Sequence, residues 1–178
     1  MKAAGLAVVL AVGLTFLLEP VNLTAGLHGP DNRSYLSQLY SLYFEQSLLL
    51  DNAKAVFGQP IIVTSTGYVL ELRNIGTALA FLPFYALGHL VCGIGGMACM
   101  GGELPVGALL SLGNWLYGLL ALVVIYRLAE RYAPRPWPAV AVAVLALGSS
   151  LFYYWTRFFS AHMPALLLAA LLVLTWDR

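Results

Sequence analysis

Residues 104–126 form an apolar run of 23 residues that contains no charged side chain. As an α-helix this run is ~34 Å long, which is enough to cross the ~30 Å hydrocarbon core of a bilayer. Gly107 and Ser111 place two small residues on one face of that helix, as is typical of close packing between membrane helices. The run therefore predicts a transmembrane helix.

The composition supports the same fold class for the rest of the chain. Hydrophobic residues make up 61% of the sequence and charged residues only 10%, whereas soluble domains are about 45–50% apolar and about 25% charged. The net charge is +1 and no cluster of Lys and Arg occurs, so no nucleic-acid partner is expected. We predict an all-α integral membrane protein, a multi-pass helical bundle in the lipid bilayer.

The first apolar run begins directly after Lys2 and is closed by Glu19-Pro20. A signal peptide has a similar basic start and apolar centre. A clean small-x-small cleavage site is missing near residues 19–26, however, and further spans follow. We therefore predict a retained transmembrane helix over 3–19, with a cytoplasmic N-terminus by the positive-inside rule.

Residues 20–76 are the longest relatively polar region and are predicted to be an extracytoplasmic loop. Within it, residues 34–50 carry an apolar stripe at helical spacing, which indicates a helix lying in the membrane interface. The stripe consists of Tyr35, Leu39, Leu42, Tyr43, Leu49 and Leu50, while Ser37, Gln38, Ser41, Glu45 and Gln46 fall mostly elsewhere. Residues 61–74 are predicted to be extended around a Ser-Thr-Gly turn.

Residues 77–100 are apolar but interrupted, because Pro83 should break the helical ladder and a Gly-rich stretch follows it. If this segment crosses the membrane, strict alternation puts the arginines of 127–135 outside, against the positive-inside rule. If it enters and leaves on the outer side, those arginines lie inside. We favour a re-entrant or interfacial segment over a transmembrane one.

The C-terminal part predicts two further spans after a basic turn at 127–138. The first covers 138–155 and ends in a belt of aromatic residues. The second, 163–176, is short of the ~20 residues that a spanning helix needs. We therefore expect residues 1–178 to be a single N-terminal transmembrane module, with a truncated last helix, of something longer.

Several of these stretches resemble a known family. The sequences "DNRSYLSQLYSLYFEQSLLLDNA" and "VTSTGYVLELRNIGTALAFLPFYALGHL" are similar to the first extracytoplasmic loop of GT-C glycosyltransferases. "LYGLLALVVIYRLAERY" and "FYYWTRFFSAHMPALLLAALLVLTW" resemble the next helices of the same bacterial group. The likeness covers about residues 5–176 and rests on loose motifs. It implies an enzyme of the bacterial inner membrane that transfers sugar from a polyprenyl-phosphate donor to a glycan, lipid or protein acceptor outside.

The resemblance implies that Asp31 is the catalytic residue, since the family has an acid early in this loop. A carboxylate there can take a proton from the acceptor or orient it. Asp31 is also a natural N-cap for a helix that starts near Asn32. Many members have a second acid next to the first, and this chain has Asn32 instead. No metal site is therefore predicted, and the cofactor stays unknown, with a divalent metal as an alternative that the sequence does not support.

Further candidates for substrate binding are Arg33, Tyr35, Asp51, Asn74, Arg157 and His162. Arg33 can bind a phosphate or be a solvated loop residue. Asp51 matches a loop acid of the family equally well as a helix-end turn residue, and Asn74 can cap the helix that follows. Arg157 can hold a donor phosphate or snorkel, and His162 matches a family histidine only loosely.

Cys92 and Cys99 match no common metal motif and are interpreted as small apolar residues. The alternative to the enzyme is a non-enzymatic polytopic protein, such as a transporter or an assembly subunit. A transporter should place polar groups at the membrane midplane, often in discontinuous helices. Apart from Asn114, the predicted spans are almost purely apolar and the polar groups gather in the 20–76 loop, which favours the enzyme. A membrane-anchored binding module is a third interpretation.

Overall fold

The computed structural model describes residues 30–48, 50–58, 63, 65–67, 73–101, 103–155 and 160–177. The elements that these residues form are helices, in agreement with the predicted all-α class. The chain divides into two compact units, residues 19–111 and residues 112–178 together with 1–18. We call them the loop unit and the hairpin unit. The predicted helix 3–19 and most of the extended segment 61–74 lie outside the described residues.

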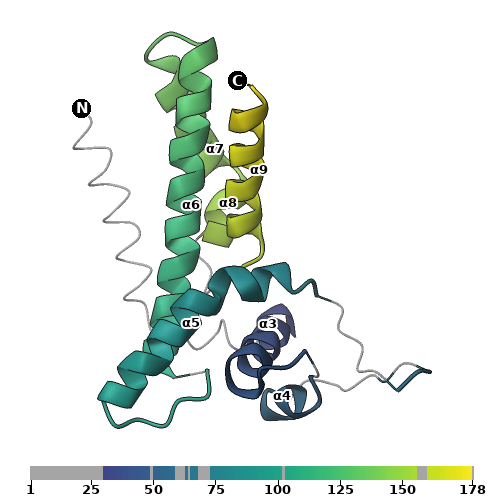
Figure 1. Cartoon of the computed structure of the whole chain (residues 1–178). Coiled ribbons are helices and arrows are strands. Elements are labelled where there is room, and N and C mark those ends of the chain that lie inside the picture. Colours follow the sequence, from purple (N-terminus) through teal and green to yellow (C-terminus); the bar gives the residue numbers. More distant parts are fainter. Residues whose placement is uncertain are drawn as a thin grey trace. The chain divides into compact units, whose positions relative to one another are not determined.

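The loop unit is built from α3 (Pro30–Tyr40), the short π-helix η1 (Ser41–Glu45), α4 (Asp51–Val56) and α5 (Gly76–Ile94). Helix α3 packs against α4 and α5, as can be followed in Figure 1. Its core is made by fully buried side chains from two of these helices: Leu36, Leu39, Ala78, Phe81 and Tyr85. Burial of these side chains holds α3 and α5 together. Helix α4 is too short to be stable alone and packs against α3.

Helix α3 differs from the predicted interfacial helix over 34–50. The helix passes into η1 at Ser41 and a left-handed residue, Gln46, ends it before α4 starts at Asp51. Ser34, Ser37, Gln38 and Ser41 are buried together with Tyr35 and Leu39. Polar side chains beside the apolar stripe are also covered, because two helices flank α3, and the serine side chains return hydrogen bonds to nearby carbonyls, such as Ser37 Oγ to Arg33 O at 2.9 Å. That this segment lies in the membrane interface stays a prediction.

Helix α5 runs without a break for 19 residues, so the prediction that Pro83 ends the helical ladder was wrong. Proline removes one hydrogen bond from a helix interior and costs roughly 3 kcal/mol there. Phe81 and Tyr85, on either side of Pro83, are fully buried, and burying two aromatic side chains offsets a cost of that size. Whether α5 crosses or re-enters a membrane stays a prediction.

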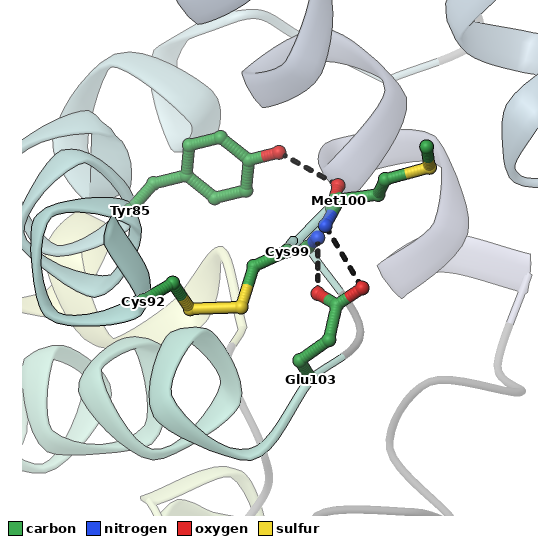
Figure 2. The surroundings of a disulfide bond; sticks show 6 residues. Tyr85, Cys92, Cys99, Met100 and Glu103 are labelled. Carbon is green, nitrogen blue, oxygen red and sulfur yellow. Dashed lines mark hydrogen bonds between the residues drawn. A yellow bond between two sulfur atoms is a disulfide. The ribbon is translucent and has the colours of Figure 1, made fainter. Parts of the chain in front are cut away.

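The two cysteines form a disulfide between Cys92 and Cys99, with a Cα–Cα distance of 6.2 Å. The interpretation of these residues as small apolar fillers was therefore wrong. Helix α5 ends at Ile94, and a glycine turn brings the chain back so that the two Cα atoms reach bonding distance. Figure 2 shows the disulfide between the end of α5 and the loop that leads to the next helix.

Helix α6 (Leu104–Tyr132) has 29 residues and continues past the predicted end at residue 126 through Arg127 and Arg131. Among the described helices, α5 and α6 are the two that are long and apolar enough to cross a membrane. Helices α7 (Trp137–Gly148) and α9 (His162–Trp176) are apolar but shorter.

The predicted span 138–155 is interrupted, because α7 ends at Gly148 and α8 (Ser150–Trp155) starts anew. Ser149 between them has an extended backbone. Its hydroxyl donates to the Leu145 carbonyl at 2.5 Å and accepts the N–H of Leu151 at 3.1 Å. One side chain thus satisfies a carbonyl at the end of α7 and an amide at the start of α8, which lets the helix break there.

Within the hairpin unit, α9 runs in the same direction as α6. Asn114 in α6 contacts Ser160 just before α9, and Arg131 near the end of α6 pairs with Asp177 just after α9. Helices α7 and α8 therefore carry the chain back from the level of the Arg131–Asp177 contact to the level of the Asn114–Ser160 contact. The core is formed by Leu122, Ala146, Trp155 and Met163, with Trp115 and Tyr154 packed against it.

Candidate functional site

Asp31, the predicted catalytic residue, forms an ion pair with Arg73. The Nε atom of Arg73 donates to Oδ1 of Asp31 at 3.0 Å, and Nη2 contacts the same oxygen. The Asp31 side chain is 59% exposed, so it is open to a substrate from solvent. Among the described residues, no hydrogen bond reaches the second carboxylate oxygen, Oδ2.

Gln38 fixes the backbone of Arg73 on the same face of α3. Its Nε2 atom donates to the Arg73 carbonyl at 2.9 Å. Gln38 and Asp31 are seven residues apart, nearly two turns of helix, so their side chains lie on one face. Gln38 holds the backbone of Arg73 at one end of this helix face, and Asp31 holds its guanidinium at the other end. The position of the guanidinium beside Asp31 is therefore set by two contacts, one of them partly buried.

The capping role considered for Asp31 takes a different form. Helix α3 begins at Pro30, so Asp31 lies inside the first helical turn and does not precede it. Proline suits the first helical position because its missing N–H would have no partner there. Asp31 still stabilises the helix through its negative charge near the N-terminus.

Arg33 and Tyr35 are less exposed than the Asp31 carboxylate. Arg33 is half-buried, and its Nη1 atom lies 3.9 Å from the position that a Cβ of Gly58 would occupy. Gly58 follows α4 and has a φ of +62°, a conformation that glycine adopts without strain. Tyr35 is buried in the core of the loop unit. Of these three candidates in α3, the structure leaves the Asp31 side chain exposed and buries Tyr35.

Asp51 and Asn74 are found at two helix starts. Asp51 is the first residue of α4, and its side chain lies outside the described part. Asn74 is exposed and follows Arg73 directly. The residue before α5 is Ile75, with no side-chain cap, so the expected capping of α5 by Asn74 was wrong. Of the predicted loop residues, Asn74 is the one nearest in sequence to the cation that pairs with Asp31.

The hairpin unit contains a second polar centre, around Asn114. This side chain is fully buried. Its Nδ2 atom donates to the carbonyls of Tyr154 at 3.0 Å and Trp155 at 3.1 Å, and its Oδ1 accepts the N–H of Ser160 at 3.0 Å. Asn114 thus satisfies the backbone at the end of α8 and before α9, where helical hydrogen bonds are missing.

The two candidates in the hairpin unit are placed in part. His162 is the first residue of α9 and packs against Tyr154, with ring centroids 3.9 Å apart. Arg157 lies outside the described residues. His162 and Asp31 belong to different units.

Residues that the sequence reasoning missed are Arg73, Gln38 and the cysteine pair. Arg73 carried one signal, since it is the last charged residue before a stretch of 29 residues, 74–102, without Asp, Glu, Lys or Arg. No comparable signal marks Gln38, because its role depends on the partner that folds back onto it. In the described part of the chain, no three side chains of His, Cys, Asp or Glu come together to hold a metal ion.

Comparison with known proteins adds no relative: no protein-family model, no curated protein and no solved structure matches this chain.

Proposed function

We propose that this chain acts in a membrane glycosyltransferase of the GT-C type, which transfers sugar from a polyprenyl-phosphate donor to an acceptor on the extracytoplasmic face. The observation that carries the proposal is the exposed Asp31 carboxylate, held by Arg73 in the most polar region of a chain with long apolar helices. The resemblance of the 31–53 and 63–90 stretches to that family supplies the reaction class.

The proposed placement puts α6 across the bacterial inner membrane. Arg127, Arg131 and Arg135 then lie in the cytoplasm, as the positive-inside rule favours. Disulfides persist in oxidising compartments such as the periplasm, so the Cys92–Cys99 loop belongs on the opposite side. These two independent signs agree on the orientation of α6. A cytoplasmic N-terminus follows if α5 stays on the outer side.

In the proposed reaction, Asp31 takes the proton from the acceptor's nucleophilic group. A bond forms between that group and the anomeric carbon of the sugar, while the bond from this carbon to the phosphate oxygen breaks. Polyprenyl phosphate leaves with the electron pair. Arg73 acts as a positioning residue, because it binds one carboxylate oxygen and so fixes the direction of the other.

The test is Asp31→Asn in the protein in its native membrane. Asparagine keeps the size of the side chain and an oxygen that accepts from Arg73, but it cannot take up a proton. Loss of a general base lowers the rate by about 10²–10⁴-fold. Transfer from a panel of radiolabelled polyprenyl-phosphate sugars is the measurement, and Asn52→Ala, at an exposed position of α4, is the control. Unchanged transfer by Asp31→Asn would remove Asp31 from the chemistry.

A second candidate function, a non-enzymatic transporter or assembly subunit, is favoured by two features of the hairpin unit. Asn114 is a buried polar residue inside the long apolar helix α6, and α7 and α8 form a broken helix. Transporters place polar groups and discontinuous helices near the midplane. In this case Asp31→Asn leaves function intact, whereas replacement of Asn114 abolishes it without unfolding the loop unit.

A further inference from the structure

The turn that joins α5 to α6 presents an unusual surface, which we call the apolar tip and define as residues 90–104. Its exposed side chains are large and hydrophobic: Leu90, Val91, Ile94, Met97, Met100 and Leu104. Ile94 is 81% exposed and Leu104 66%. Ordinary surface loops carry polar residues, whereas this turn is apolar and has no charged residue in 90–102.

Three backbone N–H groups in the turn of the tip, those of Gly95, Gly96 and Met97, are satisfied from within. The N–H of Gly95 bonds to the Val91 carbonyl at 3.0 Å, and that of Met97 bonds to the Cys92 carbonyl at 2.9 Å. Backbone groups in hydrocarbon must find such internal partners, since no water is there to replace them. The N–H groups of Gly95, Gly96 and Met97 meet this requirement although the tip is not helical beyond Ile94.

Two side chains complete the arrangement that Figure 2 shows. The Tyr85 hydroxyl donates to the Met100 carbonyl at 3.0 Å. The Glu103 carboxylate accepts the N–H groups of Met100 at 2.8 Å and Gly101 at 2.7 Å. The one acid at the edge of the tip is therefore turned toward backbone amides of the tip.

We propose that the apolar tip inserts into the extracytoplasmic leaflet and contacts the acyl chains of its lipids. The inference rests on the proposed transmembrane placement of α6. From Tyr126, next to the arginines, back to Leu104 the helix rises about 33 Å, close to the ~30 Å thickness of the hydrocarbon core. Leu104 thus reaches the outer boundary of the core. The Cys92–Cys99 bond assigns the tip to the oxidising side.

Photocrosslinking tests the occupant of this surface. The photoreactive residue p-benzoylphenylalanine replaces one of three exposed residues: Met97 in the tip, Asn52 in α4 or Leu120 in α6. After irradiation of native membranes, mass spectrometry identifies the adducts. We expect phospholipid adducts at Met97 and Leu120 and none at Asn52.

The other outcomes separate the two proposals. Lipid adducts at Leu120 but a homodimer adduct, another protein adduct or no adduct at Met97 would overturn the insertion of the tip and leave the membrane placement of α6 intact. No lipid adduct at either position would overturn the placement itself. Alkylation of denatured protein by maleimide-polyethylene glycol without reductant tests the side of the membrane: free thiols at Cys92 and Cys99 in cells would contradict the extracytoplasmic assignment.

Discussion

The loop unit and the hairpin unit bury polar side chains in different ways. In the loop unit, buried polar residues are spread over α3, η1, α4 and α5: Ser34, Ser37, Gln38, Ser41, Lys54 and Thr77. Among the described residues of the hairpin unit, the buried polar side chains are Asn114, inside α6, and Ser160, just before α9. Ser160 donates its N–H and its hydroxyl to Oδ1 of Asn114. The first pattern tolerates loss of one member, whereas the second depends on one residue.

The difference suggests two environments. A helix such as α3, with charged residues at its start and polar residues around it, suits the water side of a membrane interface. If the hairpin unit lies in lipid, the carbonyls at the end of α8 and the N–H of Ser160 must be satisfied without help from water. Asn114 serves that need. The following predictions test the contrast, beginning with the largest effect.

Replacing Asn114 by Ala should destabilise the hairpin unit by about 2–4 kcal/mol. The change removes partners from the carbonyls of Tyr154 and Trp155 and from the N–H of Ser160, and a buried polar group without a partner costs about 1–3 kcal/mol. Hydrogen-exchange mass spectrometry in nanodiscs measures the opening free energy of each helix. We expect faster exchange in α8 and α9 and unchanged exchange in α3 and α4.

The matched control is Leu120→Ala on the exposed face of the same helix. This variant shortens a side chain that is half exposed and is not among the residues packed against the described core of the hairpin unit, so exchange in α8 and α9 should match the wild type. Equal acceleration in both variants would mean that α6 loosens as a whole and that Asn114 has no special place.

Adding a methyl group at Gly118 and at Gly88 should perturb one unit each, by about 1–3 kcal/mol through overpacking. A Cβ at Gly118 would lie 2.3 Å from Cδ1 of Trp155, whose ring is buried and bonded to the Trp115 carbonyl at 2.9 Å. A Cβ at Gly88 would lie 2.7 Å from the Cα of Val106. Gly118→Ala should therefore accelerate exchange in α8, and Gly88→Ala in α5.

Gly93→Ala is the control for both, since nothing lies within 4 Å of a Cβ there. Because alanine is a better helix former than glycine, this variant should be neutral or more stable by up to about 1 kcal/mol. Exchange that rises in both units after either clashing substitution would contradict the division into two independently packed units.

The helical class followed from the sequence, whereas several boundaries did not. Apolar runs mark α5, α6 and α9 because length and hydropathy need no knowledge of partners. The continuation through Pro83 and the break at Ser149 depend on what each segment packs against or bonds to. For α3, the period of the apolar stripe shows which residues share a face, but it does not show how many faces of the helix are covered.

The candidate site was foreseen only at its carboxylate. Asp31 stood out because acids are scarce in so apolar a chain, and a known family carries an acid at a similar place. Arg73 lies 42 residues further on, and the pairing of two such residues is a tertiary fact. The disulfide was missed because seven residues of separation fit many arrangements, and only the turn after α5 brings the two Cα atoms together.

The smallest predicted effect is a pH dependence at the end of the hairpin unit. The Tyr132 hydroxyl donates a hydrogen bond to Asp177, and Arg131 Nη1 lies 2.9 Å from its Oδ2. The hydrogen bond from Tyr132, followed by the contact with Arg131, holds the pKa of Asp177 below its ordinary value. A carboxyl whose pKa is lowered by folding stabilises the fold above its unfolded pKa, near 3.9, and that contribution disappears as the pH falls through the lower folded value.

Exchange at the C-terminal turn of α9, corrected for the intrinsic rate, should therefore be constant from pH 7 to 5 and rise below about pH 4. Asp177→Asn should abolish the rise by making this turn equally labile at every pH, while α3 and α4 exchange as in the wild type. A rise below pH 4 that persists in Asp177→Asn would assign the acid sensitivity to another group. The contact between the C-terminal ends of α6 and α9 would then not depend on the Asp177–Arg131 pair.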